Sequence, residues 1–297
     1  MRLGLDIGGT KIETVVLSEV GEVIYRERCV TAKQSYRAFF QSVTEAIHKA
    51  REVVKKPLSV GLGIPGAVDS DGRIKNSNIL VLNKQPFARE LEEQLGMPVS
   101  ITNDANCFTL SEAIDGSGKG YSVVFGVILG TGCGGGLCVD NRLISGPNAC
   151  AGEWGHNALP RYNELRDGEA TLCYCGQLNC IESFISGSGL ERQYFNHAMQ
   201  HAGVPEIMKR VESGEANACL LWERYRDQLA RALAGIVNTL DPDVIVLGGG
   251  VSNIALLYPD LQARMAKYVF GQQCRTPVVQ ALHGDSSGVR GAAWLGA

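Results

Sequence analysis

The chain has 297 residues, a formal net charge of -3 and an isoelectric point near 6.0, and 45% of its residues are hydrophobic and 20% charged. A chain of this length is expected to form about two domains, and the composition is typical of a globular protein with a large core. It lacks the basic excess that nucleic-acid binding requires. It also lacks a run of about 18 apolar residues and a signal-like start, so we expect a cytoplasmic protein without membrane contact.

Ten cysteines are present, and their placement indicates two different roles. In a chain of this length without a signal segment, we expect reduced thiols rather than disulfides. Seven cysteines are scattered, whereas Cys173, Cys175 and Cys180 lie within eight residues. The clustered three therefore need a separate explanation.

The N-terminal part alternates between strand-like and helix-like patterns. Short apolar runs around glycine turns predict a three-stranded meander at the start. Apolar residues at steps of three to four then predict an amphipathic helix, and the pattern returns to strands afterwards. The expected strands cover 2–9, 12–18, 22–30, 59–68 and 99–104, and the expected helices cover 35–54, 87–95 and 105–114.

The second part repeats the opening pattern. Residues 121–147 again show strand, glycine turn, strand and turn, which indicates an internal duplication. A long helix follows to residue 240, and 243–253 predicts a buried strand, a glycine turn and a helix. We therefore expect two related α/β domains, 1–117 and 118–297, with the last helix able to pack back on the first domain. The ligand site of such folds lies beyond the carboxyl ends of strands, so we expect it in a cleft between the halves.

Three glycine-rich turns each follow an apolar strand, at 6–11, 130–136 and 248–250. Glycine lets backbone N–H groups approach phosphate oxygens, so three such turns favour a nucleotide site over ordinary hairpin turns. The middle turn matches G-x-G-x-x-G formally. A strand-like run follows it, however, in place of the helix that the dinucleotide fingerprint needs, and the P-loop pattern is absent.

Asp104 is the candidate catalytic base. Phosphoryl transfer needs a carboxylate that accepts the proton of the attacking hydroxyl. Asp104 follows a predicted strand and precedes a predicted helix, where its side chain can point into a cleft. The alternative is that Asp104 only caps the helix. The neighbouring Asn103 and Asn106 form a polar cluster that is unusual for a simple cap, which favours the catalytic role.

His156, Cys173, Cys175 and Cys180 form the candidate metal site. Three thiolates and one imidazole suit tetrahedral Zn²⁺, and a closed set of four ligands indicates a structural role. Zinc would tie the loop 157–172 to the segments that carry Glu153 and Glu182. The alternative is three buried thiols without a metal.

Seven motifs, in order, resemble the ROK family of bacterial sugar kinases and repressors, and together they cover essentially the whole chain. The resemblance implies an α/β, actin/hexokinase-like (ribonuclease H-like) duplicated fold with two domains around a nucleotide and sugar cleft. The C-terminal HGDSSGVRGAAW and the GEWGHN variant look most like the fructokinase and mannokinase branch, with N-acetylglucosamine kinases as near relatives. The motifs are DIGGTK (6–11), GLGIPGAV (61–68), NDANC (103–107), LGTGCGGG (129–136), GEWGH (152–156), CYCGQLNCIE (173–182) and DPDVIVLGGG (241–250).

The resemblance also implies the role of each site residue. Asp104 is the catalytic base, Asp6 helps to hold Mg²⁺, and His156 contacts the sugar as well as the structural Zn²⁺. The implied nucleotide-binding residues are Asp6, Gly8, Gly9, Thr10, Lys11, Thr131, Gly132, Gly134, Gly249 and Gly250. The implied sugar-binding residues are Asn78, Asn103, Asp104, Glu153, His156 and Glu182. A plain turn at Asn78 and surface positions for Glu153 and Glu182 are the alternatives.

The sequence therefore predicts an ATP-dependent hexose kinase that phosphorylates the 6-hydroxyl of fructose, with mannose and glucose as secondary substrates, and the resemblance implies a homodimer. The alternative within the enzyme class is an N-acetylglucosamine or N-acetylmannosamine kinase. A sugar-sensing repressor would carry a basic helix-turn-helix before the DIGGT motif, which here begins at Asp6. A silent sugar-binding module would be expected to lack the base at position 104.

Overall fold

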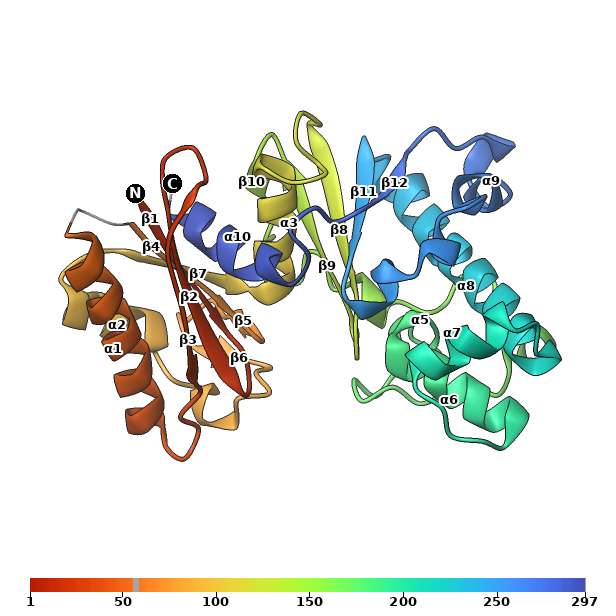
Figure 1. The fold of residues 1–297 in the computed structure, drawn as a ribbon, viewed down its shortest axis with the longest axis horizontal. Coiled ribbons are helices and arrows are strands. Elements are labelled where there is room, and N and C mark those ends of the chain that lie inside the picture. The colour runs from red at the N-terminus through yellow and green to blue at the C-terminus, as the bar shows by residue number, and fades with distance from the viewer. Residues whose placement is uncertain (56–58, 297) are drawn as a thin grey trace. The chain divides into compact units, whose positions relative to one another are not determined.

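The computed structural model describes residues 1–55 and 59–296, which divide into two compact units (Figure 1). Unit 1 comprises the described part of 1–120 together with 136–151 and 282–296, and unit 2 comprises 121–135 and 152–281. The division differs from the expected boundary between residues 117 and 118. The later segments 136–151 and 282–296 fold with the N-terminal part, so no single boundary in the sequence separates the two units.

Unit 1 is built on a five-stranded sheet of order β3-β2-β1-β4-β7. The first three strands pair antiparallel, as the predicted meander requires, and β1, β4 and β7 run parallel. Figure 1 shows α1 and α2 on one face of this sheet and α3 and α10 on the other. The bounds are β1 Arg2–Ile7, β2 Lys11–Leu17, β3 Val23–Val30, β4 Ser59–Ile64, β7 Val99–Asn103, α1 Tyr36–Val54, α2 Phe87–Leu95, α3 Asp104–Ile114 and α10 Ser287–Leu295.

Alternation along β1 decides which face each residue occupies. Leu3, Leu5 and Ile7 are buried in the core cluster that α1 and α2 complete. Because side chains of a strand alternate between faces, Gly4 and Asp6 point to the opposite side. There α10 lies so close that a Cβ on Gly4 would be 2.3 Å from the backbone nitrogen of Ala293. The same geometry places Asp6 beside the start of α10.

The strand expected over 59–68 is interrupted. β4 ends at Ile64, and Gly66 has a positive φ of 96° that turns the chain. The following residues form the short antiparallel pair β5 (Ala67–Val68) and β6 (Ile74–Lys75), followed by the 3-10 turn η1 (Leu80–Leu82). The Pro65–Gly66 turn therefore ends the strand four residues before the expected end at residue 68.

A fully buried carboxylate joins the C-terminal segment to α3. Glu112 is 0% exposed and accepts hydrogen bonds from the backbone N–H groups of Leu282 and His283, at 3.0 and 3.2 Å, and from the Ser287 hydroxyl at 2.7 Å. Nearby, burial favours the neutral form of Asp115, but hydrogen bonds from His283 and Arg290 hold its pKa below the ordinary value. These contacts explain why the chain end belongs to unit 1.

The second sheet repeats the strand order of the first, β10-β9-β8-β11-β12. Its β8, β11 and β12 run parallel, as β1, β4 and β7 do, and the preceding strands again come from a meander. The repeated order confirms the internal duplication. The end of β9 and all of β10 are grouped with unit 1. The bounds are β8 Val123–Leu129, β9 Cys133–Val139, β10 Arg142–Leu143, β11 Val244–Gly248 and β12 Val278–Gln280.

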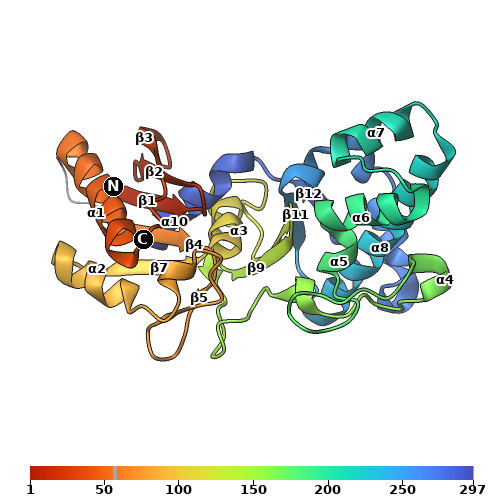
Figure 2. The same ribbon diagram turned by 90° about the horizontal axis from the view of Figure 1, so that it is seen from below.

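Unit 2 also contains a helical layer arranged around α8, against which α5, α6 and α7 pack (Figure 2). The helix α9 packs against α8 as well. The helix expected after the turn 248–250 is absent from the described chain, where β11 leads into the 3-10 turns η3 and η4. No helix among the described residues has the length and apolarity to cross a membrane. The bounds are η2 Trp154–His156, α4 Glu164–Asp167, α5 Glu182–Ile185, α6 Gly187–Ala198, α7 Val204–Glu212, α8 Ala216–Leu240, η3 Gly250–Asn253, η4 Ala255–Leu257, α9 Leu261–Ala266 and η5 Phe270–Gln272. The remaining 3-10 turn, η6 Gly284–Ser286, belongs to unit 1.

A buried ion pair fixes the loop 157–172 on α8. The side chains of Asp167 and Arg231 are both 0% exposed, and they contact each other through both carboxylate oxygens. Arg231 also donates to the carbonyl of Pro160 at 2.7 Å, and Asp167 accepts from the backbone N–H of Asn163 at 2.9 Å. Burial favours the neutral acid, but the bonds from Arg231 hold the pKa of Asp167 below the ordinary value.

We expect Asp167→Ala to lower the free energy of unfolding by about 3–5 kcal/mol, because it removes the buried carboxylate and leaves the buried Arg231 guanidinium with only the partly exposed Asp227 as an ionic partner. Urea denaturation followed by circular dichroism measures this loss. The control is Glu93→Ala, which removes the exposed Arg89–Glu93 pair and should cost less than about 1 kcal/mol. The double variant D167L/R231M should recover part of the loss. Equal losses for Asp167→Ala and the control would contradict this account.

Candidate functional site

The predicted site residues fall into two groups, each described within its own unit. Asp6, Asn78, Asn103 and Asp104 lie in unit 1 with the first glycine turn. The second and third glycine turns, Glu153, Glu182 and the cysteine cluster lie in unit 2. The first glycine turn and Asp104 follow the parallel strands β1 and β7, and the second and third turns follow the parallel strands β8 and β11; parallel strands end at one edge of their sheet.

Asp6 and Asp104 form a pair of acidic groups in unit 1. Asp6 lies near the end of β1, and Asp104 is the first residue of α3, directly after β7. Burial, followed by the negative charges of Asp104 and Glu13, raises the pKa of Asp6 from 3.8 to about 7, although Lys11 acts in the opposite direction. A cation beside Asp6 would relieve this repulsion. Mg²⁺ prefers one or two carboxylates together with phosphate oxygens, so the donor chemistry fits this ion.

The start of α10 is a third component that sequence reasoning did not assign to the site. A Cβ on Gly288 would lie 2.9 Å from Oδ2 of Asp6, so only glycine permits this approach between the helix backbone and the carboxylate. Gly288 belongs to the HGDSSG stretch, which resembles the fructokinase and mannokinase branch but to which the sequence analysis gives no role in the site. The glycine itself was the only sequence signal for this contact. Its partner, Asp6, lies more than 280 positions earlier in the chain, so the sequence pattern could not connect the two.

Asn103 is the N-cap residue of α3, and Oδ1 of Asp104 also accepts from the N–H of Ala105, at 2.9 Å. The Asn103 side chain accepts a hydrogen bond from the backbone N–H of Ala105 at 2.8 Å and donates to the carbonyl of Gly66 at 3.2 Å. Asp104 occupies the first helical position and is exposed. A helix N-terminus stabilises negative charge there. The structure therefore gives the capping role to Asn103 and presents the Asp104 carboxylate to solvent.

The first glycine turn and Asn78 lie close together. The Thr31 hydroxyl donates to the carbonyl of Gly8 at 2.7 Å, which holds the turn, and Thr10 and Lys11 are exposed. Oδ1 of Asn78 lies 3.8 Å from the position of a Cβ on Gly9.

Asn83 fixes the loop that presents Asn78. Its amide accepts from the N–H of Ser77 and donates to the carbonyl of the same residue, both at 2.9 Å. Asn78 is exposed between the buried residues Ser77 and Ile79. Sequence reasoning missed Asn83, because nothing in the local pattern shows that its amide returns to residue 77.

The second and third glycine turns meet in unit 2. β8 and β11 are parallel neighbours, and a Cβ on Gly249 would lie 2.5 Å from the carbonyl oxygen of Leu129. Gly249 has a positive φ of 79°, and Gly250 is exposed. In the second turn, Thr131 lies two residues after Leu129 and is also exposed. The two turns thus present backbone at the same edge of the sheet.

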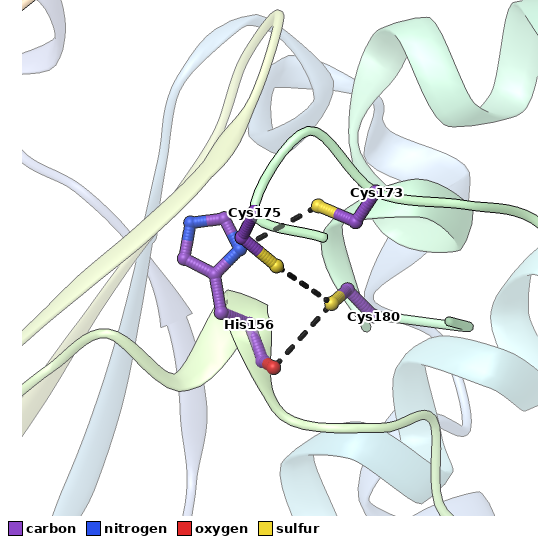
Figure 3. A group of neighbouring side chains, drawn as sticks. All are labelled: His156, Cys173, Cys175 and Cys180. Carbon is purple, nitrogen blue, oxygen red and sulfur yellow. Dashed lines mark hydrogen bonds between the residues drawn. The ribbon is translucent and has the colours of Figure 1, made fainter. Parts of the chain in front are cut away.

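The four predicted metal ligands come together as expected (Figure 3). Nδ1 of His156 and the three Sγ atoms all lie within 4.8 Å of one another. The Cys173 Sγ to His156 Nδ1 distance is 3.6 Å and the Cys175 Sγ to Cys180 Sγ distance is 3.5 Å. Tetrahedral Zn²⁺ with bonds of about 2.1 Å to nitrogen and 2.3 Å to sulfur requires ligand separations of about 3.6–3.8 Å. The cluster therefore fits Zn²⁺, which would hold the knuckle 173–180 against η2.

The second nitrogen of His156 faces Tyr174, which sequence reasoning did not consider. The Tyr174 oxygen lies 3.0 Å from Nε2. If Zn²⁺ occupies Nδ1, the neutral ring carries its proton on Nε2 and donates it to this oxygen. Partial burial, followed by the charge of Glu182, raises the pKa of Tyr174 to about 12, so its hydroxyl stays protonated. A sugar hydroxyl that binds Nε2 of His156, as expected from the sequence, must therefore either displace the Tyr174 hydroxyl or bind beside it.

The comparison with known proteins identifies the family. The model of the ROK family matches residues 2–297. The chain belongs to the ROK family. It is 41% identical over 299 residues to the N-acetyl-D-glucosamine kinase of Photobacterium profundum, with 99% of both chains covered. It is 39% identical over 297 residues to the N-acetylgalactosamine kinase AgaK of a Shewanella species, with 100% of this chain and 96% of that one covered.

Two solved ROK structures confirm the actin/hexokinase-like fold. The ROK hexokinase from Thermus thermophilus gives a TM-score of 0.88 at 29% identity and covers 99% of this chain and 97% of that one. A ROK family glucokinase from Streptomyces griseus, in complex with glucose and AMPPNP, gives 0.76 at 27% identity, with 99% and 98% covered. Both of these curated relatives are named as kinases of N-acetylhexosamines, and neither is named as a fructokinase or mannokinase.

We expect Asp6→Asn to stabilise this ROK protein in Mg²⁺-free buffer while removing its activity. Since each pKa unit corresponds to about 1.4 kcal/mol, ionised Asp6 costs the fold on the order of 4 kcal/mol above pH 7. This cost is absent below the unfolded pKa of 3.8 and grows until the pH passes about 7. The gain in melting temperature should therefore be larger at pH 8 than at pH 5. Exposed Asp71→Asn is the control, and an equal gain at both pH values would contradict the assignment.

We expect the ROK protein to purify with one zinc ion per chain, and its removal by a zinc-selective chelator to lower the melting temperature by more than about 5 °C. Metal analysis and differential scanning fluorimetry measure the two quantities. Cys175→Ser should reproduce the loss, whereas Cys150→Ser, at an exposed cysteine outside the cluster, should leave zinc content and stability unchanged. A metal-free protein that melts at the same temperature after chelation would remove the zinc assignment.

Proposed function

We propose that this protein is an ATP-dependent kinase of N-acetylhexosamines that transfers the γ-phosphoryl group to the 6-hydroxyl of N-acetylglucosamine. The observation that carries the reaction class is the exposed Asp104 carboxylate at the N-terminus of α3, in the same unit as the partly buried acid Asp6. The substrate class is supported by full-length similarity to N-acetyl-D-glucosamine kinases. These relatives favour an N-acetylhexosamine over fructose.

Asp104 acts as the base in this proposal. An exposed carboxylate whose backbone is fixed by the Asn103 cap can orient the sugar hydroxyl and accept its proton during in-line attack. Mg²⁺, when bound with ATP, offsets the negative charge of the phosphates, and Asp6 helps to hold it. Lys11 and the backbone N–H groups of the glycine turns would bind the phosphate oxygens.

The side chains proposed for sugar recognition are all polar. Asn78 and Glu153 are exposed, and Glu182 is partly buried. Each hydroxyl of a bound sugar needs a partner, because an unsatisfied buried polar group costs about 1–3 kcal/mol. Asn103 has its amide engaged by Ala105 and Gly66, so it contributes by holding Asp104 in place rather than by turning toward the sugar.

N-acetylgalactosamine is the second candidate substrate. The 39% identity to an N-acetylgalactosamine kinase over the full chain favours it specifically. The two sugars share the acetamido group and the 6-hydroxyl and differ only in the orientation of the 4-hydroxyl. One misplaced hydroxyl is worth about 1–3 kcal/mol, which corresponds to roughly 5- to 150-fold in kcat/KM.

The test is ADP release with Mg-ATP against N-acetylglucosamine, N-acetylgalactosamine, N-acetylmannosamine, glucose and fructose. We expect N-acetylglucosamine to give the highest kcat/KM and Asp104→Asn to lower kcat by at least about 100-fold, because the base is removed while binding remains. Asp71→Asn, at an exposed acid of the loop before β6, is the matched control and should retain full activity. A preference for fructose would overturn the substrate class, and an active Asp104→Asn would overturn the base.

A further inference from the structure

Two contacts join the second glycine turn to the segment that follows the metal cluster, both within unit 2. The backbone N–H of Cys133 donates to Oε2 of Glu182 at 2.8 Å, and the N–H of Gly187 donates to the carbonyl of Gly130 at 2.7 Å. The turn is therefore held at its beginning and at its end. Both contacts come from the short stretch that contains α5.

The Glu182 carboxylate packs directly on the backbone of the turn. A Cβ on Gly132 would lie 2.7 Å from Oε2, closer than van der Waals contact allows. Any side chain at position 132 would displace either the carboxylate or the turn. Glycine at position 132 thus permits the close approach of the Glu182 carboxylate that bonds Cys133, in addition to any requirement set by a ligand.

The opposite side of the turn is held by the segment that carries His156. Nε1 of Trp154 donates to the carbonyl of Gly134 at 3.0 Å. The two holding segments are themselves paired, because the N–H of Ile181 donates to the carbonyl of Asn157 at 2.8 Å. With Cys180 in the metal cluster, the position of Glu182 is set from two directions.

We propose that Glu182 is a positioning residue for the nucleotide: one carboxylate oxygen fixes the phosphate-binding turn while the other binds the sugar. Among the described residues no hydrogen bond is found at Oε1, which is the oxygen left for a sugar hydroxyl. This inference rests on the proposed function, since it takes the turn 130–134 as part of the nucleotide site. It adds to the expected role of Glu182 as a sugar ligand.

Coupling between the two substrates follows from this geometry. A sugar hydroxyl that donates to Oε1 orders the carboxylate, and the ordered carboxylate holds the Cys133 N–H and the turn in place. Nucleotide then binds a turn that is already ordered. Since coupling of binding energies is reciprocal, the nucleotide raises the affinity for sugar by the same factor.

The test measures the dissociation constant of Mg-ADP by isothermal titration calorimetry, without sugar and with saturating N-acetylglucosamine. We expect Glu182→Ala and Glu182→Asp to weaken ADP binding five- to tenfold without sugar, because neither side chain reaches the Cys133 N–H. Glu182→Gln keeps an acceptor oxygen at the right length and should bind ADP within twofold of wild type. All three should raise the KM for the sugar, and the sugar-dependent gain in ADP affinity should disappear in Glu182→Ala.

Glu153→Ala is the matched control, because Glu153 is the other candidate acid for the sugar and no contact joins its side chain to the turn in the described chain. It should weaken sugar binding and leave ADP binding unchanged. Unchanged ADP affinity in Glu182→Ala and Glu182→Asp would overturn the inference while leaving the kinase intact. A wild-type protein that binds no ADP would instead overturn the proposed function. Melting temperatures of each variant identify a change in ADP affinity caused by misfolding.

Discussion

Hydrogen bonding between parallel strands is the constraint on which the arrangement of each functional group depends. In unit 1, β1, β4 and β7 end at one edge of the sheet, which puts the first glycine turn and Asp104 at that edge. In unit 2, the parallel pair β8 and β11 brings the second and third turns to one edge in the same way. Because both sheets have the same strand order, each brings its glycine turns to the edge at which its parallel strands end. Residues that are more than 90 positions apart in the chain become neighbours through this rule alone.

Buried charged groups then fix the surrounding segments. Glu112 holds the C-terminal segment so that the start of α10 lies against Asp6, and the Asp167–Arg231 pair holds the loop next to the metal cluster. Asp6 is the exception, because its environment raises its pKa to about 7 and disfavours the ionised form. A group kept in an unfavourable state is typical of a functional position, where the cost is offset when a cation binds.

The family motifs identify the kind of chemistry but not the sugar. In the proposed function, the glycine turns, Asp104 and the other carboxylates would contact parts that many substrates share, namely phosphates, a 6-hydroxyl and neighbouring hydroxyls. An acetamido group is distinguished by the room beside the ring, which depends on packing between several segments. The expectation of fructose came from short motif variants, whereas the proposed N-acetylhexosamine substrate rests on full-length similarity to relatives named as N-acetylhexosamine kinases.

The sequence by itself determined the elements and the chemistry that depends on neighbours in the chain. It predicted the meander, the duplication, the glycine turns, a helix directly after Asp104 and the grouping of His156 with Cys173, Cys175 and Cys180, because hydrophobic period and residue type are local signals. Only the tertiary structure decided that Asn103 caps α3, that Gly288 approaches Asp6, that Tyr174 faces His156 and that Glu182 holds Cys133. These contacts depend on how side chains orient once strand order and register are set, and several of them join distant segments. Local periodicity carries no information about such pairs.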